Sequence, residues 1–223
     1  MHQSLPALLG EQYMLTAFLG ETPVSRSYAA KQRGMTREVV VESLRPELVA
    51  DSAAVESFVA AARAKAQICF PWVAAAVELL FEDESWHFVR ERPEGESLDM
   101  LAMAGRKLPG TRLCGLLQQL CRYCIFLDME GIACEDFALH HISLAGDGFV
   151  FDNTLLATPR HRGDSQRYLR HAVALLRPFL GAADPLTPTL AELMERMGEE
   201  VRWSTLSPLW YDEELCALRS RIA

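Results

Sequence analysis

Apolar positions follow strand-like runs in the first half of the chain. Val39-Val40-Val41 is a β-branched run that suits a central strand. Alternating apolar and polar positions, bounded by turn residues, favour further strands on both sides of it. The stretches that we expect to contain strands are Tyr13 to Lys31, which holds two, then Arg37 to Asp51, Val73 to Phe81 and Trp86 to Glu91. The pattern therefore predicts five strands.

Helical spacing dominates the remainder. An alanine-rich segment from about Ala53 to Ile68, with Ser52 available as the N-cap, predicts one helix between the strands. The segment from about Thr111 to Glu130 repeats leucines and cysteines at steps of three and four, which is typical of a helix buried on one broad face. Further helical runs follow Gly163 and Pro188. We expect an α+β protein.

Composition and charge narrow the classes of function. The chain has 223 residues, half of them hydrophobic, which is enough for a sizeable core. Thirty acidic residues against 22 basic ones give a net charge of -8, which argues against nucleic acid and against acidic partners in general. No apolar run is long enough for a membrane span, and the first residues lack the pattern of a signal peptide. We expect a cytoplasmic protein.

The six cysteines are too sparse for a disulfide framework at this length. Cys121 and Cys124 form a C-x-x-C pair inside the long helical pattern, where a step of three places both on one face. We interpret them as buried, reduced thiols rather than as a metal or redox pair.

The stretch from Gly131 to Asp152 resembles the catalytic loop of protein kinases. In that family the loop reads H-R-D-x-x-x-x-N, and a short hairpin and D-F-G follow it. The residues at the corresponding places are Cys134, Glu135, Asp136, His141 and Asp152, the last followed by Asn153 and Thr154. The resemblance implies that Asp136 keeps the place of the catalytic base and Asp152 that of the metal-binding aspartate. The other places are degenerate, and the asparagine that helps to hold Mg²⁺ is replaced by His141.

The hairpin that begins at Tyr13 resembles the opening of a kinase small lobe, where a G-x-G-x-x-G loop folds over the phosphates of the nucleotide. Only Gly20 remains, because Thr22 and Ser25 stand at the other two glycine places. Pro23 between them lacks a backbone N–H group. We expect this loop not to hold phosphate.

The strand Val39 to Val41 resembles the V-A-I-K strand of bacterial serine/threonine kinases, whose lysine pairs the nucleotide phosphates. Glu42 stands at the lysine place and would repel a polyphosphate. In the next helix, Ala61 stands at the place of the glutamate that pairs with that lysine. Both members of the family's ion pair are therefore absent.

The resemblance extends from about Tyr13 to Gly181 and implies a two-lobed kinase-like fold. We expect an N-lobe at about residues 11–91, built on a five-stranded antiparallel sheet, and a minimal C-lobe of four to six helices at about residues 92–223. Asp164 matches the aspartate that anchors the catalytic loop, and it follows Asp152 so closely that the usual activation segment has no room.

These degenerate places predict a pseudokinase: a kinase-like protein without phosphotransfer that acts as a protein-binding or allosteric module. A protein partner is expected, such as an active kinase or a member of its pathway, and no cofactor is expected. One alternative is a nucleotide-binding switch or weak phosphotransferase that holds ATP and Mg²⁺ through Asp136 and Asp152. Another is a protein that binds a small molecule in the cleft between the lobes.

Two further patterns have alternative interpretations. His140 and His141, with Cys134, suggest a metal site, but neighbouring strand residues point to opposite faces and disfavour it. Trp203, Trp210 and Tyr211 suggest either an exposed aromatic patch for a partner or ordinary packing of the last helices.

Overall fold

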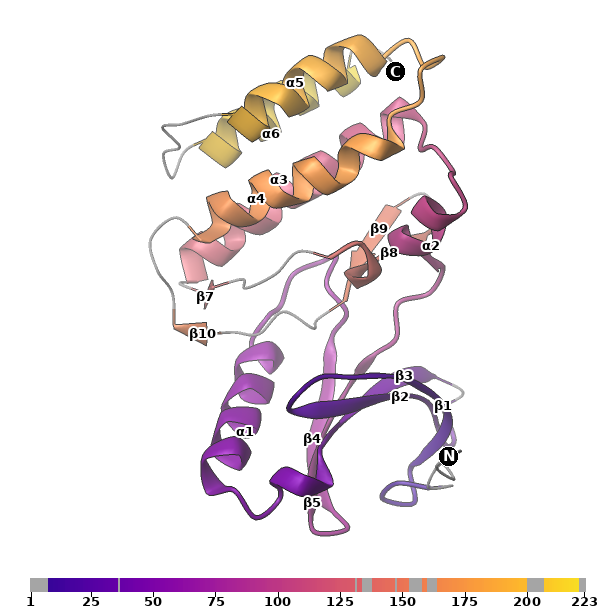
Figure 1. The fold of residues 1–223 in the computed structure, drawn as a ribbon, viewed down its shortest axis with the longest axis vertical. Helices are drawn as coiled ribbons and strands as arrows, with labels where there is room; N and C mark the ends of the chain where they lie inside the picture. Colours follow the sequence, from indigo (N-terminus) through magenta and orange to yellow (C-terminus); the bar gives the residue numbers. More distant parts are fainter. Residues whose placement is uncertain are drawn as a thin grey trace. The chain divides into compact units, whose positions relative to one another are not determined.

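The structure is a computed structural model that describes residues 8–35, 37–130, 132–133, 138–146, 148–152, 158–159, 164–199 and 207–220. The described residues form two compact units (Figure 1). The N-terminal unit comprises those of Met1–Cys69 and Val73–Pro93, and the C-terminal unit those of Phe70–Trp72 and Glu94–Ala223.

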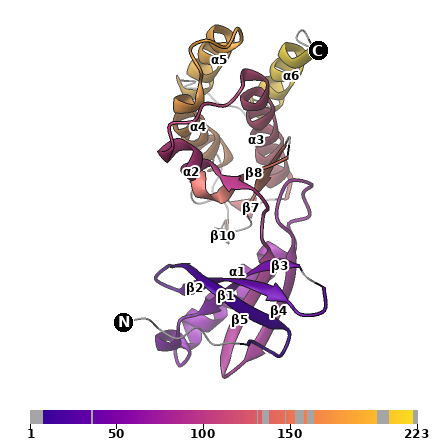
Figure 2. The ribbon, with the colours of Figure 1, turned by 90° about the vertical axis from the view of Figure 1, so that its right-hand side faces the viewer.

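The N-terminal unit is built on one antiparallel sheet, drawn in indigo to magenta in Figure 2. Its strands are β1 (Tyr13–Glu21), β2 (Ser25–Gln32), β3 (Glu38–Leu44), β4 (Ala76–Glu82) and β5 (Ser85–Glu91), in the order β1-β2-β3-β5-β4. The central place of β3 explains its β-branched run, since Val39 and Val41 are completely buried. The predicted five-stranded antiparallel sheet is confirmed.

Helix α1 (Ser52–Ala66) packs against β4 and β5, and a short 3-10 helix, η1 (Pro46–Leu48), precedes it. Phe58 and Ala62 of α1 join Leu44 and Phe88 in a buried cluster. The N-cap is Asp51 rather than Ser52: one carboxylate oxygen of Asp51 accepts hydrogen bonds from the backbone N–H groups of Ala53 and Ala54. The prediction of Ser52 as the cap was wrong by one residue, because the aspartate reaches the same donors from one position earlier.

We expect Asp51→Ala to lower the free energy of unfolding by about 1 kcal/mol, the usual cost of losing an N-cap. Ser52→Ala should change it much less, because Ser52 is the first helical residue and its side chain is not the cap. Urea unfolding of the two variants measures the difference. Equal losses would mean that the capping bonds of Asp51 contribute nothing particular to α1.

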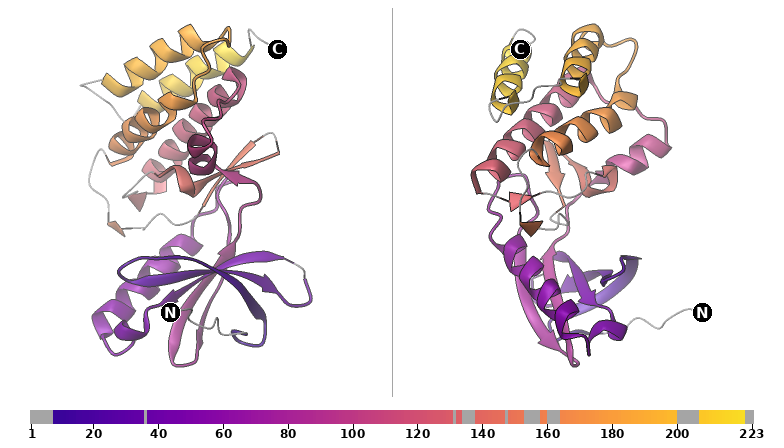
Figure 3. Two further views of the ribbon diagram at one scale, coloured as in Figure 1. Left: turned by 45° about the vertical axis from the view of Figure 1, so that its right-hand side comes forward. Right: turned by 60° about the vertical axis from the view of Figure 1, so that its left-hand side comes forward.

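The C-terminal unit is mainly helical. Its described helices are α2 (Leu98–Met103), α3 (Gly110–Glu130), α4 (Asp164–Leu176), α5 (Thr187–Glu199) and α6 (Ser207–Ser220). Helix α3 packs against α4 and α6, and α4 packs against α5 (Figure 3). A three-stranded sheet, β6-β8-β9, is formed by Glu96–Ser97, Ile142–Ala145 and Gly148–Phe151. The remaining elements are the pair β7 (Ile132–Ala133) with β10 (Thr158–Pro159) and the 3-10 helices η2 (Leu139–His141) and η3 (Arg177–Phe179).

Helix α3 is the centre of this unit, as its spacing predicts. Leu113, Leu116, Leu117 and Leu120 are completely buried. Cys121 and Cys124 are completely buried and form no disulfide within the described part of the chain, as expected for packed, reduced thiols. Burial also raises the pKa of the Cys121 thiol well above its ordinary value, so it stays protonated and unreactive. Within the described residues, no helix is both long and apolar enough to cross a membrane.

Of the three aromatic residues near the C-terminus, the structure describes the side chain of Tyr211. Tyr211, on α6, is 1% exposed, so it packs inside the unit and offers no surface to a partner. Trp203 and the side chain of Trp210 lie outside the described residues.

Candidate functional site: a charge-reversed ion cluster and a closed hairpin turn

The turn between β1 and β2 uses its own backbone donors. The N–H group of Thr22 donates to the carbonyl oxygen of Ser25 at 2.8 Å. The N–H groups of Val24 and Ser25 both donate to the hydroxyl of Thr22, at 3.2 and 3.0 Å. Pro23 has no N–H group. Every backbone donor from Thr22 to Ser25 is thus engaged within the turn, whereas a phosphate-binding loop directs such donors at its ligand. Gly20 lies before the turn on β1, paired with Ser27.

The interior of the N-terminal unit holds three charged side chains, which we call the buried triad: Glu42 on β3, Lys65 on α1 and Arg90 on β5. Nζ of Lys65 lies 3.1 Å from Oε2 of Glu42, and Nε of Arg90 lies 3.0 Å from Oε1. Each carboxylate oxygen therefore accepts from a different cation. The three residues are only 7%, 4% and 3% exposed, respectively. This is a desolvated cluster, in which a charge without a partner would be very costly.

The protonation states of the triad follow from this arrangement. Burial alone would raise the pKa of Glu42, but the ammonium of Lys65 and the guanidinium of Arg90 hold it below its ordinary value. Burial lowers the pKa of Lys65, and the carboxylate of Glu42 opposes that shift. The Lys65 ammonium also lies 5.2 Å from the centre of the Phe88 ring, a favourable cation–π contact. Glu42 is therefore a carboxylate held in place by two cations.

The triad contains an ion pair between β3 and α1 whose charges are reversed relative to kinases. In kinases the strand supplies the lysine and the helix supplies the glutamate. Here Glu42 on the strand pairs with Lys65 on the helix, one turn after Ala61. The sequence indicated that the family's lysine and glutamate are absent at Glu42 and Ala61, but it did not reveal the pair of opposite order between Glu42 and Lys65.

Two signals in the sequence could have indicated the missing partners. Lys65 is a charged residue on the same face of the helix as Ala61, where the family's glutamate would lie. Arg90 shares one face of its strand with the buried Phe88, because side chains of a strand alternate between faces. A charge on a buried face requires a partner of opposite charge, and Glu42 is that partner.

In the C-terminal unit, His141 directly precedes β8 and Asp152 directly follows β9, so both lie at the open end of the β8–β9 hairpin. The backbone N–H of Asp152 donates to the carbonyl oxygen of His141 at 2.6 Å, so the hairpin brings together the places of the family's asparagine and D-F-G aspartate. Asp164 begins α4, but its side chain is outside the described residues. Cys134, Glu135 and Asp136 lie outside them altogether.

The backbone at His140 and His141 is not extended, contrary to the prediction from the sequence. His140 and His141 belong to the 3-10 helix η2, not to a strand, and their ring centres are 4.1 Å apart at an angle of 67°. The prediction that they point to opposite faces was therefore wrong, because it assumed an extended backbone. Across the described part of the chain, no group of three or more His, Cys, Asp or Glu side chains is arranged to hold a metal ion.

An antiparallel five-stranded unit with one helix, followed by a mainly helical unit, is a protein kinase-like fold, and comparison with solved structures supports this assignment. The structure is similar to the kinase domain of PknI from Mycobacterium tuberculosis, with a TM-score of 0.67 at 14% identity over 96% of this chain and 99% of that one. A single mutant and a double mutant of that domain give TM-scores of 0.69, at 14% and 13% identity, over 98% and 97% of this chain and 99% of theirs. No family model and no curated protein matches the sequence.

Proposed function

We propose that this protein is a pseudokinase: a kinase-like module without phosphotransfer that acts by binding a cytoplasmic protein partner, such as an active kinase, or by regulating it allosterically. The observation that carries the proposal is the buried triad. At the strand position where kinases present an ammonium to the phosphates, Glu42 presents a carboxylate that is already bonded to two cations. The two cations are themselves almost completely buried against Glu42, which leaves little of their charge accessible to a ligand.

The closed turn between β1 and β2 supports the same proposal independently. Phosphate binding by a glycine-rich loop depends on backbone N–H groups that are not otherwise engaged. From Thr22 to Ser25 these groups bond within the turn or are absent. Binding a nucleotide here would first require breaking the bonds to the Thr22 hydroxyl.

We expect no change in the melting temperature when ATP or ADP is added at millimolar concentration, with or without Mg²⁺ or Mn²⁺. A ligand present at 100 times its dissociation constant would stabilise the folded state by about 2.7 kcal/mol, which a thermal-shift titration detects readily. A stabilisation by nucleotide that depends on the metal would contradict the proposal and would favour a nucleotide switch that uses Asp136 and Asp152.

A charge-restored variant gives this titration a matched comparison. Glu42→Lys combined with Lys65→Glu and Arg90→Met keeps an ion pair between β3 and α1, gives it the order found in kinases, and removes the guanidinium that Glu42 bonds in the natural protein. Any response to nucleotide should appear in this variant before it appears in the natural protein. Equal responses in both proteins would show that the order of the charges does not prevent binding.

The interaction role has its own test. Tagged protein is recovered from its own cells in the presence and in the absence of Mg²⁺-ATP, and the bound proteins are compared. Because the proposed module does not use nucleotide, the same partners should be recovered in both cases. Partners that are retained only with Mg²⁺-ATP would contradict it.

A further inference from the structure

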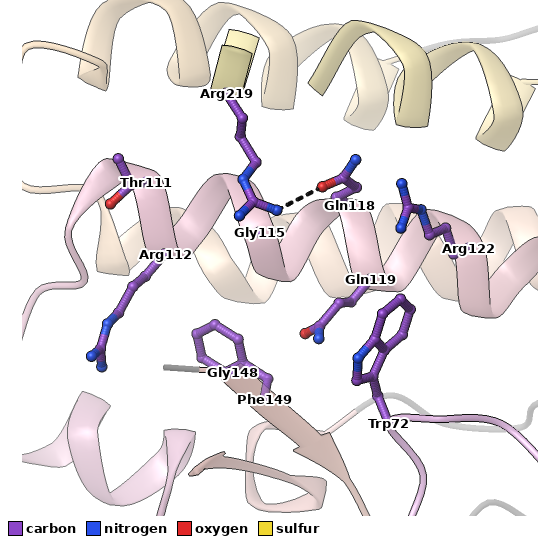
Figure 4. Close-up of a pocket in the computed structure, with 10 residues that line it drawn as sticks. All are labelled: Trp72, Thr111, Arg112, Gly115, Gln118, Gln119, Arg122, Gly148, Phe149 and Arg219. Atoms are coloured by element: carbon purple, nitrogen blue, oxygen red, sulfur yellow. Dashed lines mark hydrogen bonds between the residues drawn. The ribbon is translucent and has the colours of Figure 1, made fainter. Parts of the chain in front are cut away.

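The C-terminal unit contains a cavity of about 360 Å³ that the proposed function does not use. Its size falls in the range of sites for small molecules rather than for a folded partner. Helix α3 forms one wall with a polar stripe that includes Arg112, Gln119 and Arg122, residues that share a face because they are spaced by seven and three. Three further residues line the cavity and enter the argument below: Arg219 of α6, Phe149 of β9 and Trp72 (Figure 4).

Arg219 gives this cavity a positive charge. Its guanidinium donates to Oε1 of Gln118 at 2.9 Å, which orients it without neutralising it (Figure 4). A Cβ atom added at Gly115 would lie 3.9 Å from Nη1 of Arg219, an ordinary van der Waals separation, so the guanidinium lies close over this residue of α3. Arg122, in contrast, is bonded to Asp212 at 2.9 Å. Within the described residues, Arg219 has no carboxylate partner, although the chain as a whole is acidic.

The other residues that line the cavity favour two further features in a ligand, a flat ring and a hydrogen-bond donor. Phe149 and Trp72 lie on one side of α3, where their rings offer apolar surface to a flat group (Figure 4). Oε1 of Gln119 is buried and accepts no hydrogen bond from the described part of the chain. A buried acceptor without a partner is costly, so a ligand that donates to it would be favoured.

We propose that this cavity binds a small aromatic acid that carries a hydroxyl or amino group on its ring. The carboxylate lies on the guanidinium of Arg219, whose fork of donors matches carboxylate geometry. The ring packs against Phe149 and Trp72, and its polar substituent donates to Gln119. All of these residues belong to the C-terminal unit, so the site is independent of the buried triad and of the outcome with nucleotide.

The probe is 4-hydroxybenzoate, titrated by calorimetry in the absence of nucleotide and metal. We expect saturable binding that weakens by about ten-fold when the neutral 4-hydroxybenzamide replaces it, since a hydrogen bond to a charged group contributes about 1.5 kcal/mol or more. Benzoate, which has no donor for Gln119, should also bind more weakly. Failure of 4-hydroxybenzoate to bind at 10 mM (about the weakest affinity worth assigning to such a site) would overturn the proposal.

Two variants separate this site from general attraction of anions. Arg219→Gln removes the charge and should weaken binding by about ten-fold. Arg106→Gln removes one positive charge from an exposed pair with Glu96 in the same unit and should leave binding unchanged. Arg219→Lys keeps the charge and guards against a loss caused by misfolding, so it should retain part of the affinity. Equal losses in Arg219→Gln and Arg106→Gln would contradict the site.

A local readout completes the test. With 5-fluorotryptophan incorporated, the fluorine resonance of Trp72 is assigned from its disappearance in Trp72→Phe. Addition of 4-hydroxybenzoate should shift the resonance of Trp72 and leave that of Trp86, in the N-terminal unit, unchanged. A shift of Trp86 without a shift of Trp72 would place the ligand elsewhere.

Discussion

Replacing Glu42 with glutamine is expected to lower the free energy of unfolding by about 3 to 5 kcal/mol, the usual cost of removing one partner from a buried ion pair. The size of the effect follows from the arrangement of the triad. Glutamine has nearly the same shape but no charge, so Lys65 and Arg90 would be left as two buried cations without their carboxylate. Urea unfolding measures the loss, and amide hydrogen exchange of β3 should locate it in the N-terminal unit.

The matched control is Lys65→Met, which removes a cation instead of the anion. Glu42 keeps its bond to Arg90, and methionine fills much of the volume of the lysine stem beside Phe88. We expect a smaller loss than for Glu42→Gln, about 2 kcal/mol, the usual contribution of one hydrogen bond to a charged group, because Arg90 still neutralises the carboxylate. Equal losses from Glu42→Gln and Lys65→Met would contradict the view that the carboxylate holds the cluster together.

The dependence of stability on the Glu42 carboxylate should also appear when the protein is unfolded by acid. Because the pKa of Glu42 is lowered in the folded protein, its contribution to stability is fully present above the ordinary pKa of a glutamate. That contribution disappears as the pH falls through the lower pKa of the folded state. In Glu42→Gln this part of the acid dependence should be missing.

Gly95→Ala is expected to lower the free energy of unfolding by roughly 3 to 5 kcal/mol, which is in the range of severe single substitutions. Gly95 has a φ angle of +97°, which residues with a side chain rarely adopt. A Cβ atom there would lie 1.9 Å from the carbonyl oxygen of Leu144, in the backbone of β8. Since backbone atoms cannot rotate away as a side chain can, the pairing of β6 with β8 would have to shift.

Gly105→Ala separates the cost of the positive φ angle from the cost of the contact with the backbone. Gly105 also has a positive φ angle, of +65°, but a Cβ atom there would meet nothing within 4 Å. Its cost should therefore be the conformational cost alone, about 1 kcal/mol. Thermal unfolding of both variants gives the comparison, and similar losses would show that the contact with Leu144 does not limit residue 95.

The sequence pattern predicted the elements better than their ends. The β-branched run of β3 and the leucine spacing of α3 are strong signals because each side chain reports directly on a buried face. The N-cap of α1 was misplaced by one residue because Asp51 and Ser52 are both good caps, and only the geometry of the turn decides between them.

The site was harder to predict because it joins distant parts of the chain. Glu42 stands out in its strand, but its partners are 23 and 48 positions away. A helix register and a strand pairing must both be known before Lys65 and Arg90 can be placed beside it. The cavity around Arg219 has the same origin, since α3, α6 and β9 each supply only part of it.

The triad also limits how far α1 can move relative to β3. In protein kinases, the position of the helix that carries the paired glutamate is adjusted to turn activity on and off. Moving α1 away from β3 here would pull Lys65 from the carboxylate in a buried environment and would cost several kcal/mol, about as much as breaking a buried ion pair. We therefore expect α1 to keep one position, so that under the proposed function a partner that contacts this helix would meet a surface of constant shape.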